Sequence, residues 1–237
     1  MHIRSRAIVL NKTKYSESSV IARIFTREAG VQSFILKSAF SKKNKGKLAL
    51  LENLSLVELT FDDYREGIKY LNDIALYHPY SLIPFDMVRR TLFIFYNEIL
   101  YKILKDFSAD AKLFDFIEQS LLELDGETAR LADIHLRFMV NFSKILGFFP
   151  TDNFSAQNCH FFIEESAFIH DYFDYPDYLS KEASAYLSDL MHEAIPQLPP
   201  KEIRNELLYG LIRYFEKHNE QIHHIESVPI LAALLAK

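Results

Sequence analysis

Residues 20–36 read VIARIFTREAGVQSFIL, and this stretch decides the fold of the first third of the chain. Residues 20–26 and 31–36 are rich in β-branched and aromatic side chains that partly alternate with polar ones, a pattern typical of half-buried strands. Between them, Glu28, Ala29 and Gly30 have the composition of a hairpin turn, in which glycine suits a position with positive φ. Two strands joined by a tight turn are therefore predicted.

Three more strand-like segments lie outside this hairpin, at residues 6–10, 54–61 and 68–76. Residues 11–19 are polar and favour a turn before the second strand, and residues 62–67 favour a turn before the last one. Five strands, grouped as three and two around a long third connection, match a small closed or nearly closed barrel such as the OB-fold. An SH3-like barrel has similar strand spacing, so the pattern by itself leaves both barrels open.

The apolar period changes to that of helices after residues 78–84, a linker with two prolines. Residues 151–178 are predicted to be irregular, and residues 159–169 within them are compatible with a β-hairpin. The sequence thus predicts an α+β chain, with a five-stranded barrel domain at residues 1–80 and an all-α helical domain at residues 81–237. Helices are predicted at residues 85–107, about 111–124, about 127–146, 180 to about 194, 199 to about 218, and 228–236.

The composition is that of a globular protein without membrane or secretion signals. The chain has 237 residues, of which 49% are hydrophobic and 25% charged. Its one cysteine, Cys159, excludes an internal disulfide and a cysteine-based zinc cage, and fits a reducing compartment. No apolar run approaches the roughly 20 residues that span a bilayer, and residues 1–6 lack the apolar core of a signal peptide. We expect a soluble cytoplasmic protein.

Positive charge is concentrated at one end of the chain. Residues 1–47 contain eleven Lys and Arg and two acids, a net charge of +9, whereas the other 190 residues contain 16 and 30, a net charge of −14. Residues 37–47, which we call the lysine arm, read KSAFSKKNKGK and hold five of these lysines. Such a segment is either a mobile surface loop or a flexible cationic arm that follows a polyanion. The charge distribution favours polyanion binding through the N-terminal end.

The sequence contains no motif for catalysis or for a bound cofactor. Six glycines are scattered singly, and the phosphate-loop, dinucleotide-binding and G-x-S-x-G patterns do not occur. The best metal candidates, Cys159-His160 and His223-His224, are adjacent pairs without a partner at ligand spacing. The acidic pairs Asp62-Asp63 and Glu164-Glu165 lie in turn-like contexts and are interpreted as solvated charges. These patterns argue against an enzyme and predict no cofactor.

A small barrel with basic loops suits single-stranded nucleic acid, which binds by charge along its backbone and by base stacking on aromatic side chains. Phe34 lies in an apolar strand and is predicted to be core, whereas Tyr15 lies in a polar loop and is equally compatible with base contact and with plain exposure. Arg23 and Lys37 alternate with apolar neighbours and are expected to point outward. The aromatic candidates are Tyr15, Phe34, Phe40 and Tyr64. The predicted DNA-binding residues are Arg4, Arg6, Lys12, Lys14, Tyr15, Arg23, Arg27, Lys37, Lys42, Lys43, Lys45 and Lys47.

Segments along nearly the whole chain, taken in order, resemble the family of the bacterial recombination mediator RecO. No single motif is specific; their order is what carries the resemblance. The N-terminal matches are residues 7–10 (AIVL), 15–19 (YSESS), 25–30 (FTREAG) and the lysine arm. The later matches are residues 96–100 (YNEIL), Arg137-Phe138 with 146–148 (LGF), 214–218 (YFEKH) and 227–231 (SVPIL).

The resemblance implies an OB-fold followed by a helical domain, in a DNA repair and homologous recombination mediator of the bacterial cytoplasm and nucleoid. It implies binding of single- and double-stranded DNA, annealing of complementary strands, and loading of RecA, together with RecR, onto DNA coated by the single-strand-binding protein SSB. It also implies docking of the acidic, phenylalanine-ended SSB tail on the helical domain. Arg137 matches a family arginine implicated there, and an arginine beside apolar helix residues could hold a carboxylate. An ordinary surface arginine is the alternative.

The sequence departs from the family in one region. Many members carry a four-cysteine zinc module, but here residues 152–178 contain Cys159 alone, so no zinc is expected. Aromatic residues are expected to supply apolar packing in its place, namely Phe161, Phe162, Phe168, Tyr172, Phe173, Tyr175 and Tyr178. The competing functional hypothesis is a non-enzymatic adaptor whose barrel binds protein instead of nucleic acid.

Overall fold

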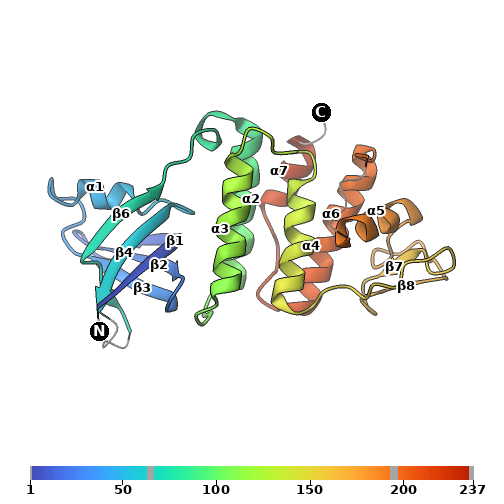
Figure 1. The fold of residues 1–237 in the computed structure, drawn as a ribbon, viewed down its shortest axis with the longest axis horizontal. Coiled ribbons are helices and arrows are strands. Elements are labelled where there is room, and N and C mark those ends of the chain that lie inside the picture. Colours follow the sequence, from blue (N-terminus) through green and yellow to red (C-terminus); the bar gives the residue numbers. More distant parts are fainter. Residues whose placement is uncertain (1, 63–66, 193–196, 235–237) are drawn as a thin grey trace. The chain divides into compact units, whose positions relative to one another are not determined.

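The computed structural model describes residues 2–62, 67–192 and 197–234 (Figure 1). Tyr64, one of the aromatic candidates, lies outside these ranges. The strands are β1 (His2–Lys14), β2 (Val20–Thr26), β3 (Gly30–Leu36), β4 (Leu56–Asp62), β5 (Lys69–Tyr70), β6 (Asp73–His78), β7 (His160–Phe162) and β8 (Ala167–Ile169). The helices are α1 (Lys45–Ala49), a short 3-10 helix (Ile83–Phe85), α2 (Met87–Ile103), α3 (Ala111–Asp125), α4 (Ile134–Leu146), α5 (Lys181–Met191), α6 (Lys201–His218) and α7 (Ser227–Leu234).

The chain divides into two compact units. The barrel unit comprises Met1–Phe85 and Asn97–Asp125, and the helical unit comprises Asp86–Tyr96 and Gly126–Lys237. Helix α2 is therefore shared between the units, and α3 belongs with the barrel. The boundary predicted at residue 80 stays a prediction. None of the helices in the described ranges combines the length and the hydrophobicity needed to cross a bilayer.

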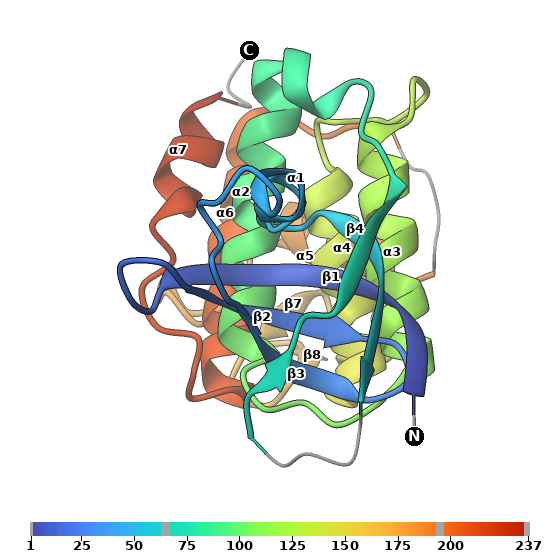
Figure 2. The same ribbon diagram turned by 90° about the vertical axis from the view of Figure 1, so that its left-hand side faces the viewer.

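The barrel unit is built on a curled sheet with the strand order β5-β3-β2-β1-β4-β6 (Figure 2). Strand β1 pairs antiparallel with β2 through its second half and with β4 through its first half. At the two edges, β5 pairs parallel with β3 and β6 pairs antiparallel with β4. Because only residues 71–72 separate β5 from β6, the two edges of the sheet converge at this corner. The result is an OB-like half-barrel, which confirms the predicted fold class.

Two details of the sheet differ from the sequence prediction. Strand β1 runs to Lys14 instead of ending at residue 10, because Asn11 to Lys14 continue the ladder with β2 after a bulge. Polar residues are tolerated there because Thr13 and Lys14 are exposed. The last predicted strand is interrupted at residues 71–72, so the described residues hold six strands in this sheet where five were expected.

The core of the barrel follows the alternation seen in the sequence. Phe34 is fully buried, as predicted, and packs edge-on against Phe61 with ring centroids 5.3 Å apart. Ala39, Leu51 and the inward residues of β1 to β4 join the same cluster. Burial of these side chains contributes about 1.5–3 kcal/mol for each large apolar group. The segment between β3 and β4 is thus anchored in the core at both of its ends.

Helix α3 packs on the barrel through the apolar stripe that its sequence predicted. Phe114 contacts Phe25 of β2 with ring centroids 5.6 Å apart. Gly30, at the end of the hairpin turn, has a φ of +71°, as predicted, and lies against the backbone of residues 107–109. At the far end of α3, the Asp125 carboxylate accepts hydrogen bonds from the backbone of Ser81 and the next two residues. Burial alone would raise the pKa of Asp125, but these bonds hold it below its usual value.

Most helix ends agree with the prediction. Helix α2 ends at residue 103, whereas the sequence predicted an end at residue 107, and the ends predicted at about residue 194 and at residue 236 lie outside the described residues. The Ser180 hydroxyl caps α5 by accepting from Ala183, Pro200 precedes α6, and Gly147 ends α4 in the left-handed conformation at φ +86°. Helix α4 begins at residue 134 instead of 127, because Asp133 is tied into side-chain contacts described below. The hairpin expected at residues 159–169 is present as β7 and β8.

The aromatic residues of the insert play two different roles. Phe161 and Phe168 are buried and pack against each other with centroids 5.2 Å apart, as expected for a substitute core. Tyr172, Phe173 and Tyr175, in contrast, are 45%, 60% and 62% exposed. The proposed replacement of the zinc module by aromatic packing therefore applies to only part of the cluster.

Candidate nucleic-acid interface

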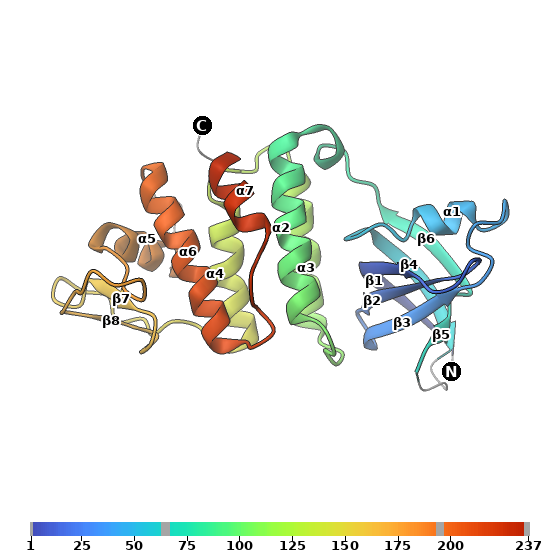
Figure 3. The ribbon, with the colours of Figure 1, turned by 180° about the vertical axis from the view of Figure 1, so that it is seen from behind.

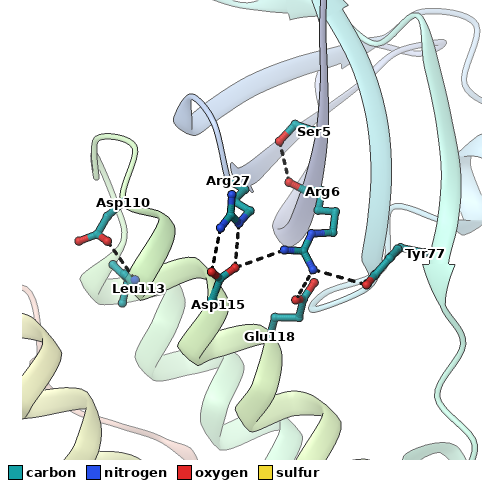
Figure 4. Close-up of polar contacts among 8 residues, drawn as sticks. All are labelled: Ser5, Arg6, Arg27, Tyr77, Asp110, Leu113, Asp115 and Glu118. Carbon is teal, nitrogen blue, oxygen red and sulfur yellow. Dashed lines mark hydrogen bonds and ion pairs between the residues drawn. The ribbon is translucent and has the colours of Figure 1, made fainter.

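Most of the predicted DNA-binding residues fall into three groups according to their partners, and the first group is held by α3 and by the segment just before it. Arg27 donates two hydrogen bonds to the Asp115 carboxylate, at 2.8 and 2.9 Å (Figure 4). Arg6 donates to Glu118 at 2.7 Å and to Asp115 at 3.3 Å. Arg23 donates to the backbone carbonyl of Lys105 and pairs with Asp106 at 3.1 Å. These contacts attach the sheet to α3 within the barrel unit.

The electrostatics of this contact favour the paired state. The hydrogen bonds that Arg27 donates hold the pKa of Asp115 below its usual value, and the same bonds, together with the negative charge of Asp115, raise the pKa of Arg27. Burial raises the pKa of Glu118, although the nearby Arg6 opposes the shift. Two parallel N–H···O bonds to a carboxylate use the same donor geometry that arginine offers to a phosphate. Arg6 and Arg27 therefore already have anionic partners on α3.

The second group consists of cations that are paired at the surface, among them Lys47, whose ammonium lies 3.8 Å from the Asp73 carboxylate. Arg4 forms two hydrogen bonds with Glu58, at 2.7 and 2.6 Å, across β1 and β4. Lys47 donates to the carbonyl of Asn72 at 2.5 Å. Exposed pairs of this kind contribute little to stability and are weakened by salt. They leave their cations accessible to a competing anion.

The third group surrounds a groove between the end of β1 and α1. Lys14 and Lys45 lie on its rim, and the described residues offer their ammonium groups no ion pair. Lys12 also lies on the rim, where it pairs with Glu52. The groove has a volume of about 470 Å³ and is lined by Lys12, Lys14, Val20, Phe40, Lys45, Leu48, Ala49 and Glu52. Its lining is therefore partly apolar and partly charged, with three lysines and one glutamate, and we call the apolar lining residues its floor and the charged ones its rim.

The lysine arm is folded and does not extend as a free arm. The side-chain amide of Asn44 donates to the carbonyls of Lys37 and Ser38, at 2.9 and 3.3 Å, and so closes the loop on itself. The backbone N–H of Ala39 donates to Ser18 at 2.7 Å, which ties the arm to the β1–β2 loop. Lysines 42, 43 and 45 are exposed on this closed frame. Figures 1 and 3 show α1 and α3 on opposite sides of the sheet.

Tyr15 and Lys37 are also placed in the open. Tyr15 is 63% exposed in the β1–β2 loop and does not line the groove. The Lys37 ammonium lies 4.8 Å from the centre of the Tyr70 ring, an exposed cation–π contact. The outward direction predicted for Lys37 is thus confirmed.

Arg137, the residue matched to the family's SSB-tail arginine, lies in the helical unit beside a buried carboxylate. Its Nε is 3.8 Å from Asp133, and its side chain is 21% exposed. Asp133 is fully buried and accepts hydrogen bonds from Arg130 and from the Tyr186 hydroxyl. Burial would raise the pKa of Asp133, but these bonds hold it below its usual value. The role of Arg137 in tail binding stays a prediction.

The groove residues that were not predicted from the sequence are Glu52 and three apolar residues. Val20, Leu48 and Ala49 form part of its floor, and each belongs to an apolar run that predicts core. Asn44 was absent from the predicted site, although asparagine among lysines is a common turn former. For metal sites, no cluster of three or more His, Cys, Asp or Glu occurs in the described part of the chain. The prediction that zinc is absent remains to be tested by elemental analysis of protein purified without a metal-binding tag.

Comparison with known proteins identifies two family models that cover most of the chain. Residues 1–80 match "Recombination protein O N terminal" and residues 84–224 match "Recombination protein O C terminal". The DNA repair protein RecO of Phocaeicola vulgatus is 26% identical over 235 residues, 97% of each chain. The protein of that name in Porphyromonas gingivalis is 34% identical over 159 residues, 66% of this chain and 65% of the relative. The one in Flavobacterium psychrophilum is 31% identical over 152 residues, 63% of both.

Proposed function

Because the chain belongs to the recombination protein O family, we propose that this DNA repair and recombination protein binds DNA through the lysine arm and the groove beside α1. The observation that carries this proposal is the unequal pairing of the cations. Arg6, Arg23 and Arg27 have carboxylate partners at α3 or just before it, whereas Lys14 and Lys45 have no ion pair in the described residues. Free ammonium groups gain a phosphate without losing a partner.

The proposal is tested by fluorescence anisotropy with a labelled oligonucleotide. Changing Lys42, Lys43 and Lys45 together to alanine should weaken binding and lower the slope of log affinity against log salt by about 2 for a single strand, because three phosphate contacts are lost. A control variant removes equal charge from Lys105, Lys112 and Lys181, which are exposed and lie outside the groove. Equal loss in both variants, or binding indifferent to salt, would contradict the proposal.

The finer roles rest on the family resemblance. We propose that the protein acts without catalysing covalent chemistry, binds single- and double-stranded DNA, anneals complementary strands, and works with RecR and SSB to load RecA in the bacterial cytoplasm at the nucleoid. Annealing would follow when one cationic surface neutralises two strands, so it needs no ATP. Mixing complementary labelled strands with the unaltered protein and with the triple lysine variant checks this, since only the first should accelerate annealing.

We also propose that Arg137 contacts the carboxylate-rich tail of SSB. The proposal rests on the match of Arg137 to the family arginine, and the side chain of Arg137 is 21% exposed, so solvent reaches part of it. An acidic, phenylalanine-ended peptide should bind the unaltered protein more tightly than Arg137→Ala. Because Arg137 also approaches Asp133, the melting temperature of each variant must be measured alongside, and Arg137→Lys serves as the charge-preserving control.

A further inference from the structure

The groove beside α1 has a feature that phosphate binding does not require, an exposed aromatic ring on an anchored segment. Phe40 is 56% exposed, whereas its neighbour Ala39 is fully buried in the barrel core. Ser38, two residues earlier, adopts the left-handed conformation at φ +50°. A side chain in a loose loop needs no special explanation for exposure. Phe40 is different, because hydrogen bonds at Ala39 and Asn44 fix the segment that presents it.

The ring lines a groove whose other apolar residues come from separate elements. Val20 begins β2, and Leu48 and Ala49 belong to α1. The cations stand around this apolar floor, with Lys14 at the end of β1 and Lys45 at the start of α1. A cationic protein surface can contact only the phosphates and groove edges of duplex DNA, because the bases of a duplex are stacked. A single strand offers free base faces between its phosphates.

We propose that one unstacked base of a single strand enters this groove and packs against Phe40, while Lys14 and Lys45 contact the phosphates on either side. The proposal rests on DNA binding by the lysine arm, and it adds a base-binding subsite that favours single strands over duplex. Glu52 stands on the same rim and forms an ion pair with Lys12. We therefore assign the two phosphate contacts to Lys14 and Lys45. Stacking on an aromatic ring is sequence-tolerant, because every base has a π-face.

The absence of tryptophan from the chain makes a direct test possible. Phe40→Trp introduces the one tryptophan of the variant at the groove, where it can be excited selectively over the tyrosines, and stacking of a base should quench it. The titrants are a ten-residue oligothymidylate, an abasic strand with the same number of phosphates, and a duplex of equal length. Only the first should quench strongly. Phe173→Trp is the matched control, since Phe173 has a similar exposure of 60% but lies in the helical unit, and its fluorescence should change little.

A second variant measures the effect on affinity. Phe40→Ala should weaken oligothymidylate binding about 5- to 150-fold, the range for losing one base–aromatic stack, and leave duplex binding and the melting temperature unchanged. Equal weakening of single strand and duplex, no weakening of either, or equal quenching by the abasic strand would overturn the base-binding subsite. Those results leave DNA binding by the lysines intact if the triple lysine variant binds more weakly than the unaltered protein. No binding of any oligonucleotide by the unaltered protein would overturn both proposals.

Discussion

His135 is a buried side chain that should make the helical unit less stable in acid. It is 2% exposed, its Nδ1 finds no hydrogen-bond partner in the described residues, and its ring meets Phe95 edge-on with centroids 6.3 Å apart. Burial lowers the pKa of His135 to about 3. The unfolded chain takes up this proton near pH 6.5, so the folded state loses stability as the pH falls from about 6.5 towards 3, and the group has no such effect at higher pH.

Replacing this histidine should therefore reduce the acid sensitivity of the protein. Between pH 7 and pH 5, the unaltered protein should lose about 2 kcal/mol of unfolding free energy relative to His135→Leu. Urea unfolding at the two pH values, followed by circular dichroism, measures the difference. Parallel losses in the two proteins would mean that His135 is protonated in the folded state.

At the scale of elements, α3 pairs with the arginines of the barrel, whereas the lysine arm holds the lysines for which we propose DNA binding. Arg27→Ala removes both hydrogen bonds to Asp115 and leaves that carboxylate facing Arg6 alone. We expect it to lower the melting temperature without lowering DNA affinity. Lys43→Ala should lower DNA affinity without lowering the melting temperature. It should also reduce the slope of log affinity against log salt for single-stranded DNA by about 0.7.

The two variants control for each other, since each removes one positive charge from the same unit. Thermal unfolding and anisotropy titrations on both give four measurements. A loss of DNA affinity in Arg27→Ala at a temperature where the variant is fully folded would show that α3 releases this arginine to DNA. In that case the original prediction for Arg27 would hold.

At the scale of the whole molecule, the division into units makes a prediction about cooperative unfolding. A Cβ added at Gly30 would lie 2.5 Å from the carbonyl oxygen of Phe107, at a φ of +71° that L-residues rarely adopt. Gly30→Ala should therefore destabilise the barrel unit by roughly 2–5 kcal/mol. Hydrogen exchange followed by mass spectrometry should show faster exchange in β1 to β4 and in α3 together, with a smaller change in α5 and α6.

Gly46→Ala is the control, because Gly46 lies within α1 and its added Cβ would meet nothing within 4 Å. It should leave exchange unchanged or slow it slightly, since alanine favours a helix over glycine. In Gly30→Ala, α3 could instead remain as protected from exchange as α5 and α6. The boundary predicted at residue 80 would then describe the folding units better than the division after residue 125.

The sequence predicted those features that depend on a local pattern. It did not predict contacts between residues that lie far apart in the chain. Alternation identified Phe34 as core, and caps at Ser180 and Gly147 located helix ends, because each depends on neighbours within a few residues. Charge counting found the basic end of the chain but treated Arg27 and Lys43 alike. What separates them is Asp115, 88 residues beyond Arg27 in sequence. The floor of the groove was missed for the same reason, since Val20 and Leu48 meet only in the folded barrel.

The amide of Asn44, which closes the lysine arm on Lys37 and Ser38, bears on the entropy of association. Fixing the backbone of one residue takes about 1–2 kcal/mol of conformational entropy, and an arm that ordered only on contact would incur this for each residue from 37 to 44. In this structure the backbone of these residues is already ordered by folding, before any DNA strand binds. The backbone of the arm is preorganised, so the DNA contacts that we propose for it would be opposed only by the ordering of the lysine side chains.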